Sequence, residues 1–155
     1  PFRGSGRSAS TGCNTAHQIL TQRRGDAERM KDLNSISGAI VDAAFHIHRT
    51  LGPGLLESVY EVVLAHELER RGLKVERQKS VSITYDGLRF DEGFRADLIV
   101  ENCVVVELKS VEELSRVHPK QLLTYLRLLD YRLGLLINFG APVIKDGIRR
   151  VVNRL

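Results

Sequence analysis

The chain has 155 residues, a net charge of +4 and two cysteines. This length is enough for one domain with its own core, while Cys13 and Cys103 supply neither a disulfide framework nor the spacing of a metal site. No apolar run is long enough to span a membrane and no signal peptide is recognisable, so we expect a soluble, cytoplasmic protein.

The segment 1–29 differs from the rest of the chain in composition. It is rich in Gly, Ser, Thr and Arg, lacks apolar periodicity and contributes +3 of the net charge of +4. We therefore predict that residues 1–29 are a disordered or non-native extension and that residues 30–155 form the folded domain. The +1 that remains neither supports nor excludes nucleic-acid binding.

Apolar periodicity and turn residues divide the rest of the chain into helices and strands. In chain order, the predicted elements are a helix at 34–51, a helix at 55–71, a strand at 75–85 that turns at 86–87, a hairpin around residues 101–103, a helix at 118–129, a strand at 132–138 and a terminal hairpin at 143–151. This order predicts an α/β protein with a mixed central β-sheet flanked by helices. The helix at 118–129 favours a parallel crossover between the strands on either side of it.

The hairpin around residues 101–103 carries charges within apolar strands, where an unpaired charge is costly. If residues 101–103 form a three-residue loop, Val100 pairs with Val104, and Asp97 lies about 5 Å from Glu107 on the same face. A two-residue turn would place the two acids on opposite faces. Carboxylates this close repel each other, and Mg²⁺ or Mn²⁺ is the usual ion that keeps both charged. The alternative is an ordinary hairpin with solvent-facing charges.

Three further groups are candidates for chemistry. Glu57, at the start of the second helix, either complements the helix dipole or supplies a third carboxylate. Gln121 and Tyr125 share a face of the third helix, where they reach a phosphate or a carboxylate or simply form a polar edge. His118 lies next to that face and is a minor candidate. No Ser/His/Asp or Cys/His arrangement is apparent.

Four motifs occur together in one order. They are Gly54-x-x-Glu57-x-x-Tyr60, Asp97…Glu107-x-Lys109, Gln121-x-x-x-Tyr125 and Gly134-Leu-Leu-Ile-Asn138-Phe-Gly140. With these motifs the chain, from about Leu33 to Asn153, resembles the bacterial GxxExxY protein family, which is assigned to the PD-(D/E)XK nuclease superfamily. Ala96 stands where the superfamily's name has Pro, a residue that carries no chemistry.

The resemblance implies a restriction-endonuclease-like core and a set of functional residues. Asp97, Glu107, Glu57 and the backbone carbonyl of Leu108 are the expected ligands of Mg²⁺ or Mn²⁺, and Lys109 is the expected catalytic lysine. The accessory or substrate-binding candidates are Gln121, Tyr125, Tyr60 and His118. The expected activity is metal-dependent hydrolysis of phosphodiester bonds in nucleic acid, with DNA as the expected substrate. The sequence does not by itself separate DNA from RNA.

Two other readings remain open. The first is a catalytically inactive nuclease-fold module that binds nucleic acid or a protein, and the second is a regulatory subunit that docks on a partner or on a second copy of the chain. Metal binding separates these readings from the nuclease. The sequence does not determine endonuclease or exonuclease action, substrate structure or oligomeric state.

Overall fold

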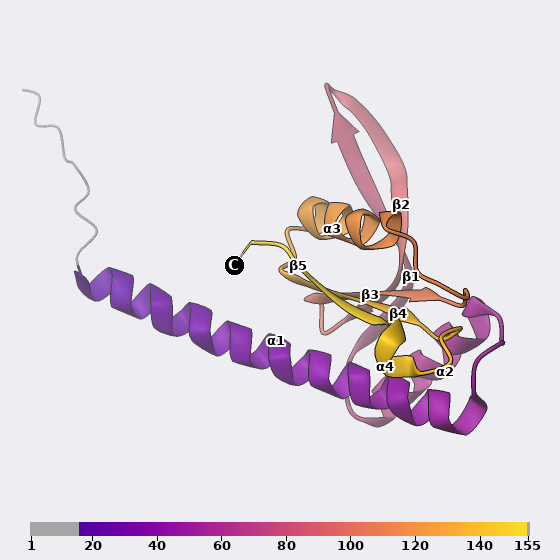
Figure 1. Ribbon diagram of the computed structural model, residues 1–155. Coiled ribbons are helices and arrows are strands. Elements are labelled where there is room, and N and C mark those ends of the chain that lie inside the picture. Colours follow the sequence, from indigo (N-terminus) through magenta and orange to yellow (C-terminus); the bar gives the residue numbers. More distant parts are fainter. Residues whose placement is uncertain (1–15, 155) are drawn as a thin grey trace, which may run out of the picture. The chain divides into compact units, whose positions relative to one another are not determined.

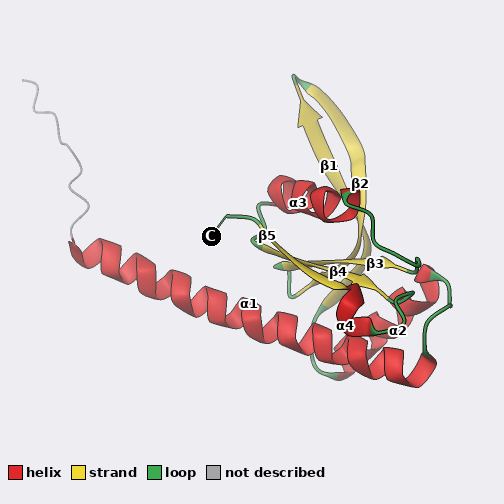
Figure 2. Ribbon diagram, viewed as in Figure 1, coloured by secondary structure: helices red, strands yellow, loops and turns green. Residues whose placement is uncertain are grey.

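Figures 1 and 2 show a computed structural model of the chain, in which residues 16–154 are described. The chain divides into two units, Pro1–Lys31 and Asp32–Leu155. Every candidate site residue belongs to the second unit, and the description that follows concerns this unit unless stated otherwise. No helix within residues 16–154 is both long enough and apolar enough to cross a membrane.

Four helices and five strands make up the described residues. In chain order they are α1 (Ala16–Leu51), α2 (Glu57–Arg70), β1 (Val75–Tyr85), β2 (Leu88–Val100), β3 (Val104–Lys109), α3 (Val117–Leu129), β4 (Leu133–Asn138), α4 (Ile144–Gly147) and β5 (Ile148–Val152).

Two sequence predictions about these elements are wrong. The first helix begins at Ala16 rather than at residue 34, so residues 16–29 of the expected disordered extension are helical, while residues 1–15 lie outside the described part. The expected terminal hairpin is instead the short helix α4 followed by β5. A Cβ on Gly147 would lie 2.4 Å from the carbonyl oxygen of Asn138, so α4 packs too tightly against the end of β4 for any larger residue there.

The five strands form one mixed sheet in the order β1-β2-β3-β4-β5. Neighbouring strands are antiparallel except for β3 and β4, which are parallel and connected through α3. Helix α3 lies on one side of the sheet, and α2 lies on the other (Figure 1). The fold class is therefore the predicted one, an α/β protein with a mixed central sheet and flanking helices, consistent with a restriction-endonuclease-like core.

The core on the α3 side consists of aliphatic side chains. Leu122 and Leu126 of α3 pack with Val105 of β3 and Leu136 of β4, all of them almost completely buried. Gly134 permits this approach, because a Cβ at that position would lie 2.9 Å from a methyl group of Leu122. This packing holds the apolar face of α3 against the strands. The helical period then fixes the direction of the polar face of α3.

Asn138, at the end of β4, fixes the loop that follows β3. Its Oδ1 atom accepts hydrogen bonds from the backbone N–H groups of Val111 and Gly140, both at 3.0 Å, and its Nδ2 donates to the Val111 carbonyl at 2.8 Å. The residue is 1% exposed. Asn138 thereby ties the chain just beyond Lys109 to β4, which keeps the end of β3 in place.

We expect Asn138→Ala to lower the free energy of unfolding by about 2–4 kcal/mol, because it leaves buried backbone groups without partners. Urea denaturation of the two proteins measures this difference. Asn153→Ala is the matched control, since the Asn153 side chain is also buried but donates one hydrogen bond, to the Tyr131 carbonyl. Equal losses in the two variants would contradict the role assigned to Asn138.

Candidate active site

The sheet brings Asp97 of β2 and Glu107 of β3 together. The observed loop at 101–103 has three residues, and the register pairs Val100 with Val104 and Leu98 with Val106, as predicted. The same register places Asp97 opposite Glu107. The two carboxyl groups are close enough to share a hydrogen bond when one of them is protonated. Next to Leu98, the Asp97 side chain rather than the backbone forms the hydrogen bond to β3. Its Oδ2 accepts the backbone N–H of Leu108 at 2.8 Å.

Burial makes this pair of acids unfavourable when both are charged. Burial and the neighbouring Asp97 carboxylate raise the pKa of Glu107 from 4.5 to about 8. Burial also raises the pKa of Asp97, although the hydrogen bond from Leu108 opposes this rise. Glu107 is only 9% exposed, and its Oε1 atom is buried without a hydrogen-bond partner in the described structure. A buried carboxylate oxygen without a donor is costly and commonly marks a functional site.

Lys109 follows Glu107 on the same face of β3. Its charge lowers the pKa of both Asp97 and Glu107, so the ammonium group lies near the two acids. The Lys109 backbone is held on the β4 side, because its carbonyl accepts the N–H of Phe139 at 2.8 Å. Backbone groups alternate along a strand, so the Leu108 carbonyl points to the opposite side, toward Asp97. The carbonyl expected as a metal ligand thus lies on the side of the acid pair.

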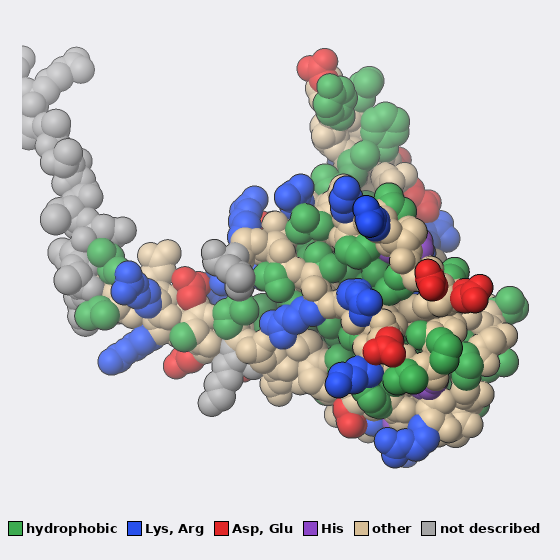
Figure 3. Space-filling view, viewed as in Figure 1, with side chains coloured by type: hydrophobic (Ala, Val, Ile, Leu, Met, Phe, Trp, Pro, Cys, Tyr) green, Lys and Arg blue, Asp and Glu red, His purple; other side chains and the backbone are tan. Residues whose placement is uncertain are grey.

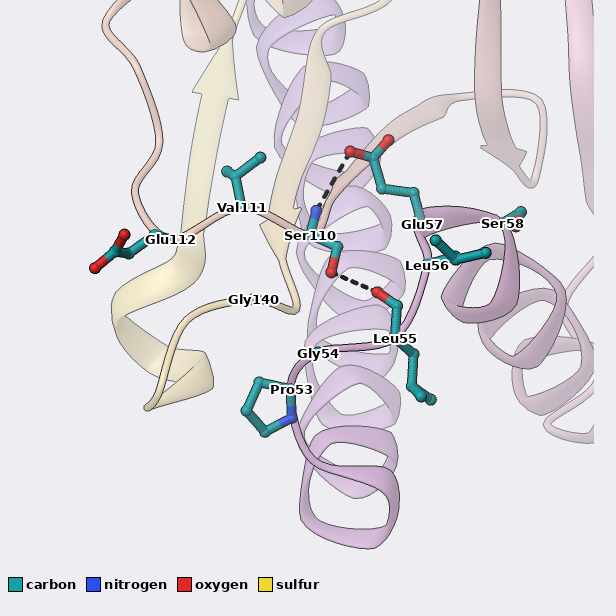
Figure 4. Close-up of a pocket in the computed structure, with 10 residues that line it drawn as sticks. All are labelled: Pro53, Gly54, Leu55, Leu56, Glu57, Ser58, Ser110, Val111, Glu112 and Gly140. Carbon is teal, nitrogen blue, oxygen red and sulfur yellow. Dashed lines mark hydrogen bonds between the residues drawn. The ribbon is translucent and has the colours of Figure 1, made fainter.

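Glu57, the predicted third carboxylate, lies at the start of α2 and points toward the end of β3 (Figure 4). Its Oε1 accepts the backbone N–H of Ser110 at 3.4 Å. It also lines an open pocket of about 780 Å³ that Asp97 and Glu107 do not line. No set of three or more His, Cys, Asp or Glu within residues 16–154 is arranged to hold a metal ion. The structure therefore assembles a pair of acids, and Glu57 as a third ligand stays a prediction.

Glu61, another acid of α2, is linked to Asp97 of the acid pair through hydrogen bonds. Glu61 is 6% exposed, and its charge contributes to the raised pKa of Asp97. Its Oε2 accepts a hydrogen bond from Gln78 Nε2 at 2.5 Å, and the same nitrogen lies 3.4 Å from Asp97 Oδ1. Sequence reasoning missed both residues. The one available signal was an acidic residue within the apolar stripe of α2, next to Tyr60 and Leu64.

Helix α3 contributes the predicted polar pair. Gln121 Nε2 donates to the Tyr125 hydroxyl at 2.7 Å, so the two side chains do share a face. Burial, followed by the charge of Glu107, raises the pKa of Tyr125, so its hydroxyl lies within electrostatic range of the acids. Phe94 of β2 stacks on this ring with centroids 4.0 Å apart and so fixes it against the sheet.

Two further predicted residues, Tyr60 and His118, have local structural contacts. Tyr60 has no exposed surface, its ring stacks on Phe139, and its hydroxyl donates to the Gly52 carbonyl at 2.6 Å and accepts the N–H of Leu55. Burial and two backbone partners occupy the Tyr60 side chain, and its role as a substrate-binding or accessory residue stays a prediction. His118 Nδ1 accepts the N–H of Ser115, which ties the turn before α3.

The acid pair is suited to a hard divalent cation. Carboxylate and carbonyl oxygens are the ligands that Mg²⁺ and Mn²⁺ prefer. A cation would also supply the partner that the buried Glu107 oxygen lacks. Its positive charge would offset the repulsion between the two carboxylates. The donors present therefore fit the ion, with Asp97 Oδ1, Glu107 and the Leu108 carbonyl as the groups that would hold it.

A mixed sheet whose antiparallel pair presents two acids and a following lysine is the arrangement of a restriction-endonuclease-like fold. Residues 34–151 match the family model described as the PD-(D/E)XK nuclease superfamily. The chain belongs to this superfamily, whose nucleases generally use divalent metal ions. Comparison with curated proteins and with solved structures gives no significant match. Membership of the narrower GxxExxY family stays a prediction.

Proposed function

We propose that the chain is a metal-dependent nuclease that hydrolyses phosphodiester bonds in nucleic acid, with DNA as the expected substrate and Mg²⁺ or Mn²⁺ as the cofactor. One observation carries the proposal: Glu107 keeps a buried oxygen without a partner beside a second acid, with Lys109 adjacent. A purely structural hairpin would gain stability by replacing such a group with an apolar or amide side chain.

Each residue has a distinct role in this proposal. Asp97, Glu107 and the Leu108 carbonyl would hold the ion, with Glu57 of α2 as the expected further ligand. The bound ion supplies Lewis-acid polarisation of the scissile phosphate and lowers the pKa of a water. Lys109 orients the attacking water and stabilises the negative charge that develops on the phosphoryl oxygens. Gln121 and Tyr125 orient the backbone phosphate.

We expect the chain to recognise nucleic-acid structure or ends rather than a base sequence. On the face shown in Figure 3, basic and acidic side chains are interspersed, in keeping with the small net charge of the chain. No base-specific recognition motif is recognisable in the sequence, so we do not expect the chain to read base edges. Phosphate contacts near Lys109 and α3 then position the substrate.

Titration of Mn²⁺ into the full chain, followed by calorimetry, tests the proposal. We expect one or two ions to bind the wild type and the affinity to fall by at least about tenfold in Asp97→Asn and in Glu107→Gln, which keep the shapes of the side chains. Glu112→Gln, an exposed acid outside the pair, is the control. If the wild type binds no Mn²⁺, the proposed nuclease function is wrong. The inactive module or the regulatory subunit is then the conclusion.

A further inference from the structure

Gln78 occupies an unusual backbone conformation in the middle of β1. Its φ angle is +48°, whereas its neighbours continue the pairing with β2, Arg77 with Leu98 and Lys79 with Ala96. A residue other than glycine is strained in this region, and such residues are concentrated at functional sites. The strand thus tolerates strain at a single position without losing its register.

The positive φ of Gln78 changes the direction in which its side chain points. Successive side chains of a regular strand point to opposite faces, yet Arg77 and Gln78 bind the same carboxylate. Arg77 Nε donates to Glu61 Oε1 at 3.0 Å, and Gln78 Nε2 donates to Glu61 Oε2 at 2.5 Å. The positive φ therefore turns the Gln78 amide toward α2 and toward the acid pair.

The amide nitrogen of Gln78 bridges two carboxylates. It lies 2.5 Å from Glu61 Oε2 and 3.4 Å from Asp97 Oδ1. Only a donor is stable between two acceptors, and the NH₂ group of an amide offers two hydrogens without adding a charge that would repel a cation. Because Asp97 Oδ2 already accepts the N–H of Leu108, both oxygens of Asp97 then have protein donors.

We propose that Gln78 is a positioning residue that holds Asp97 in the orientation required for metal binding and anchors it to Glu61 of α2. The assignment rests on the proposed function, since it concerns the ion that Asp97 would hold. Glu61 is the fixed end of this link, because its side chain is 8% exposed and paired with Arg77. Gln78 itself contacts neither ion nor substrate in this arrangement.

The test compares Gln78→Ala and Gln78→Gly with the wild type in the full chain. Glycine adopts the positive φ without strain, so it removes the amide while relieving the backbone. We expect the Kd for Mn²⁺ to rise about tenfold or more in both variants, as is typical when a partner of a metal ligand is removed. Asn102→Gly is the control, because Asn102 has a φ of +53° in the exposed turn between β2 and β3.

Thermal unfolding without metal accompanies each titration and separates positioning from folding. If Gln78 only shapes the strand, Gln78→Gly will unfold at the wild-type temperature or higher and will bind Mn²⁺ with an unchanged Kd, which overturns the assignment. If Gln78→Gly folds and binds weakly, the assignment stands. If the wild type binds Mn²⁺ and Gln78→Gly binds it with the same Kd, this inference alone is refuted. If the wild type does not bind Mn²⁺, the proposed function is refuted and this assignment with it.

Discussion

Replacing Lys109 with alanine is expected to lower the rate of phosphodiester hydrolysis by about 10²–10⁴-fold and to leave Mn²⁺ binding intact. The ammonium group is a cation and cannot bind the ion, but Lys109 follows Glu107 on β3 and its charge lowers the pKa of both acids. Its loss removes the group that orients water and stabilises developing charge. Single-turnover cleavage of a mixture of linear, nicked and branched DNA measures the rate, and calorimetry measures metal affinity.

Two further variants are the controls for the Lys109 experiment. Lys145→Ala removes an exposed lysine of α4 and should cleave at the wild-type rate. Asp97→Ala should lose both cleavage and Mn²⁺ binding, since Asp97 is an expected ligand. Cleavage by Lys109→Ala at the wild-type rate would show that the lysine has no catalytic role, whatever the metal does.

Glu107→Gln is expected to stabilise the metal-free protein at pH 8. The pKa of Glu107 is raised from 4.5 to about 8, so between these values the folded state retains a proton that the unfolded chain has lost. The free energy of unfolding therefore falls as the pH rises through this window and stays low above it, and the raised pKa of Asp97 acts in the same direction. Because one pKa unit corresponds to about 1.4 kcal/mol, the glutamine should recover several kcal/mol at pH 8.

Urea denaturation in EDTA at pH 5 and pH 8 measures this effect. The wild type should lose stability between the two values, and Glu107→Gln should lose much less. Added Mn²⁺ should then restore the wild type at pH 8 without helping the variant, because an ion that binds only the folded state stabilises it. Glu113→Gln, an exposed acid, is the control. Equal stability of wild type and Glu107→Gln at pH 8 would contradict a buried, unpartnered carboxylate at this position.

The acid pair could be predicted because its geometry is local. Asp97 and Glu107 are joined by one hairpin, and the alternation of side chains fixes their face once the loop length is known. The three-residue loop and the Val100–Val104 pair confirm that register. The same holds for Gln121 and Tyr125, since four residues on a helix define a shared face, and their hydrogen bond confirms it.

Other features required contacts between distant segments. Nothing near Glu61 in the sequence indicates that Gln78 of β1 will bind it, or that Gln78 will adopt a positive φ to do so. The Asp146-Gly147 signal predicts a hairpin, but Gly147 is needed as the small residue against Asn138, and β5 instead pairs with β4. The sequence also contained no sign that the Tyr60 ring would be buried against Phe139.

The sequence by itself therefore determined the α/β order, the register of the β2–β3 hairpin and the residues at its centre, because period and loop length act over a few neighbouring positions. Only the tertiary structure decided which side chains surround that centre. The packing of α2 and β1 against β3 decides the burial of Glu107 and the link from Asp97 through Gln78 to Glu61. It also decides that Glu57 accepts the N–H of Ser110. Packing between distant segments sets solvation and hydrogen bonding, and these set the chemistry of the site.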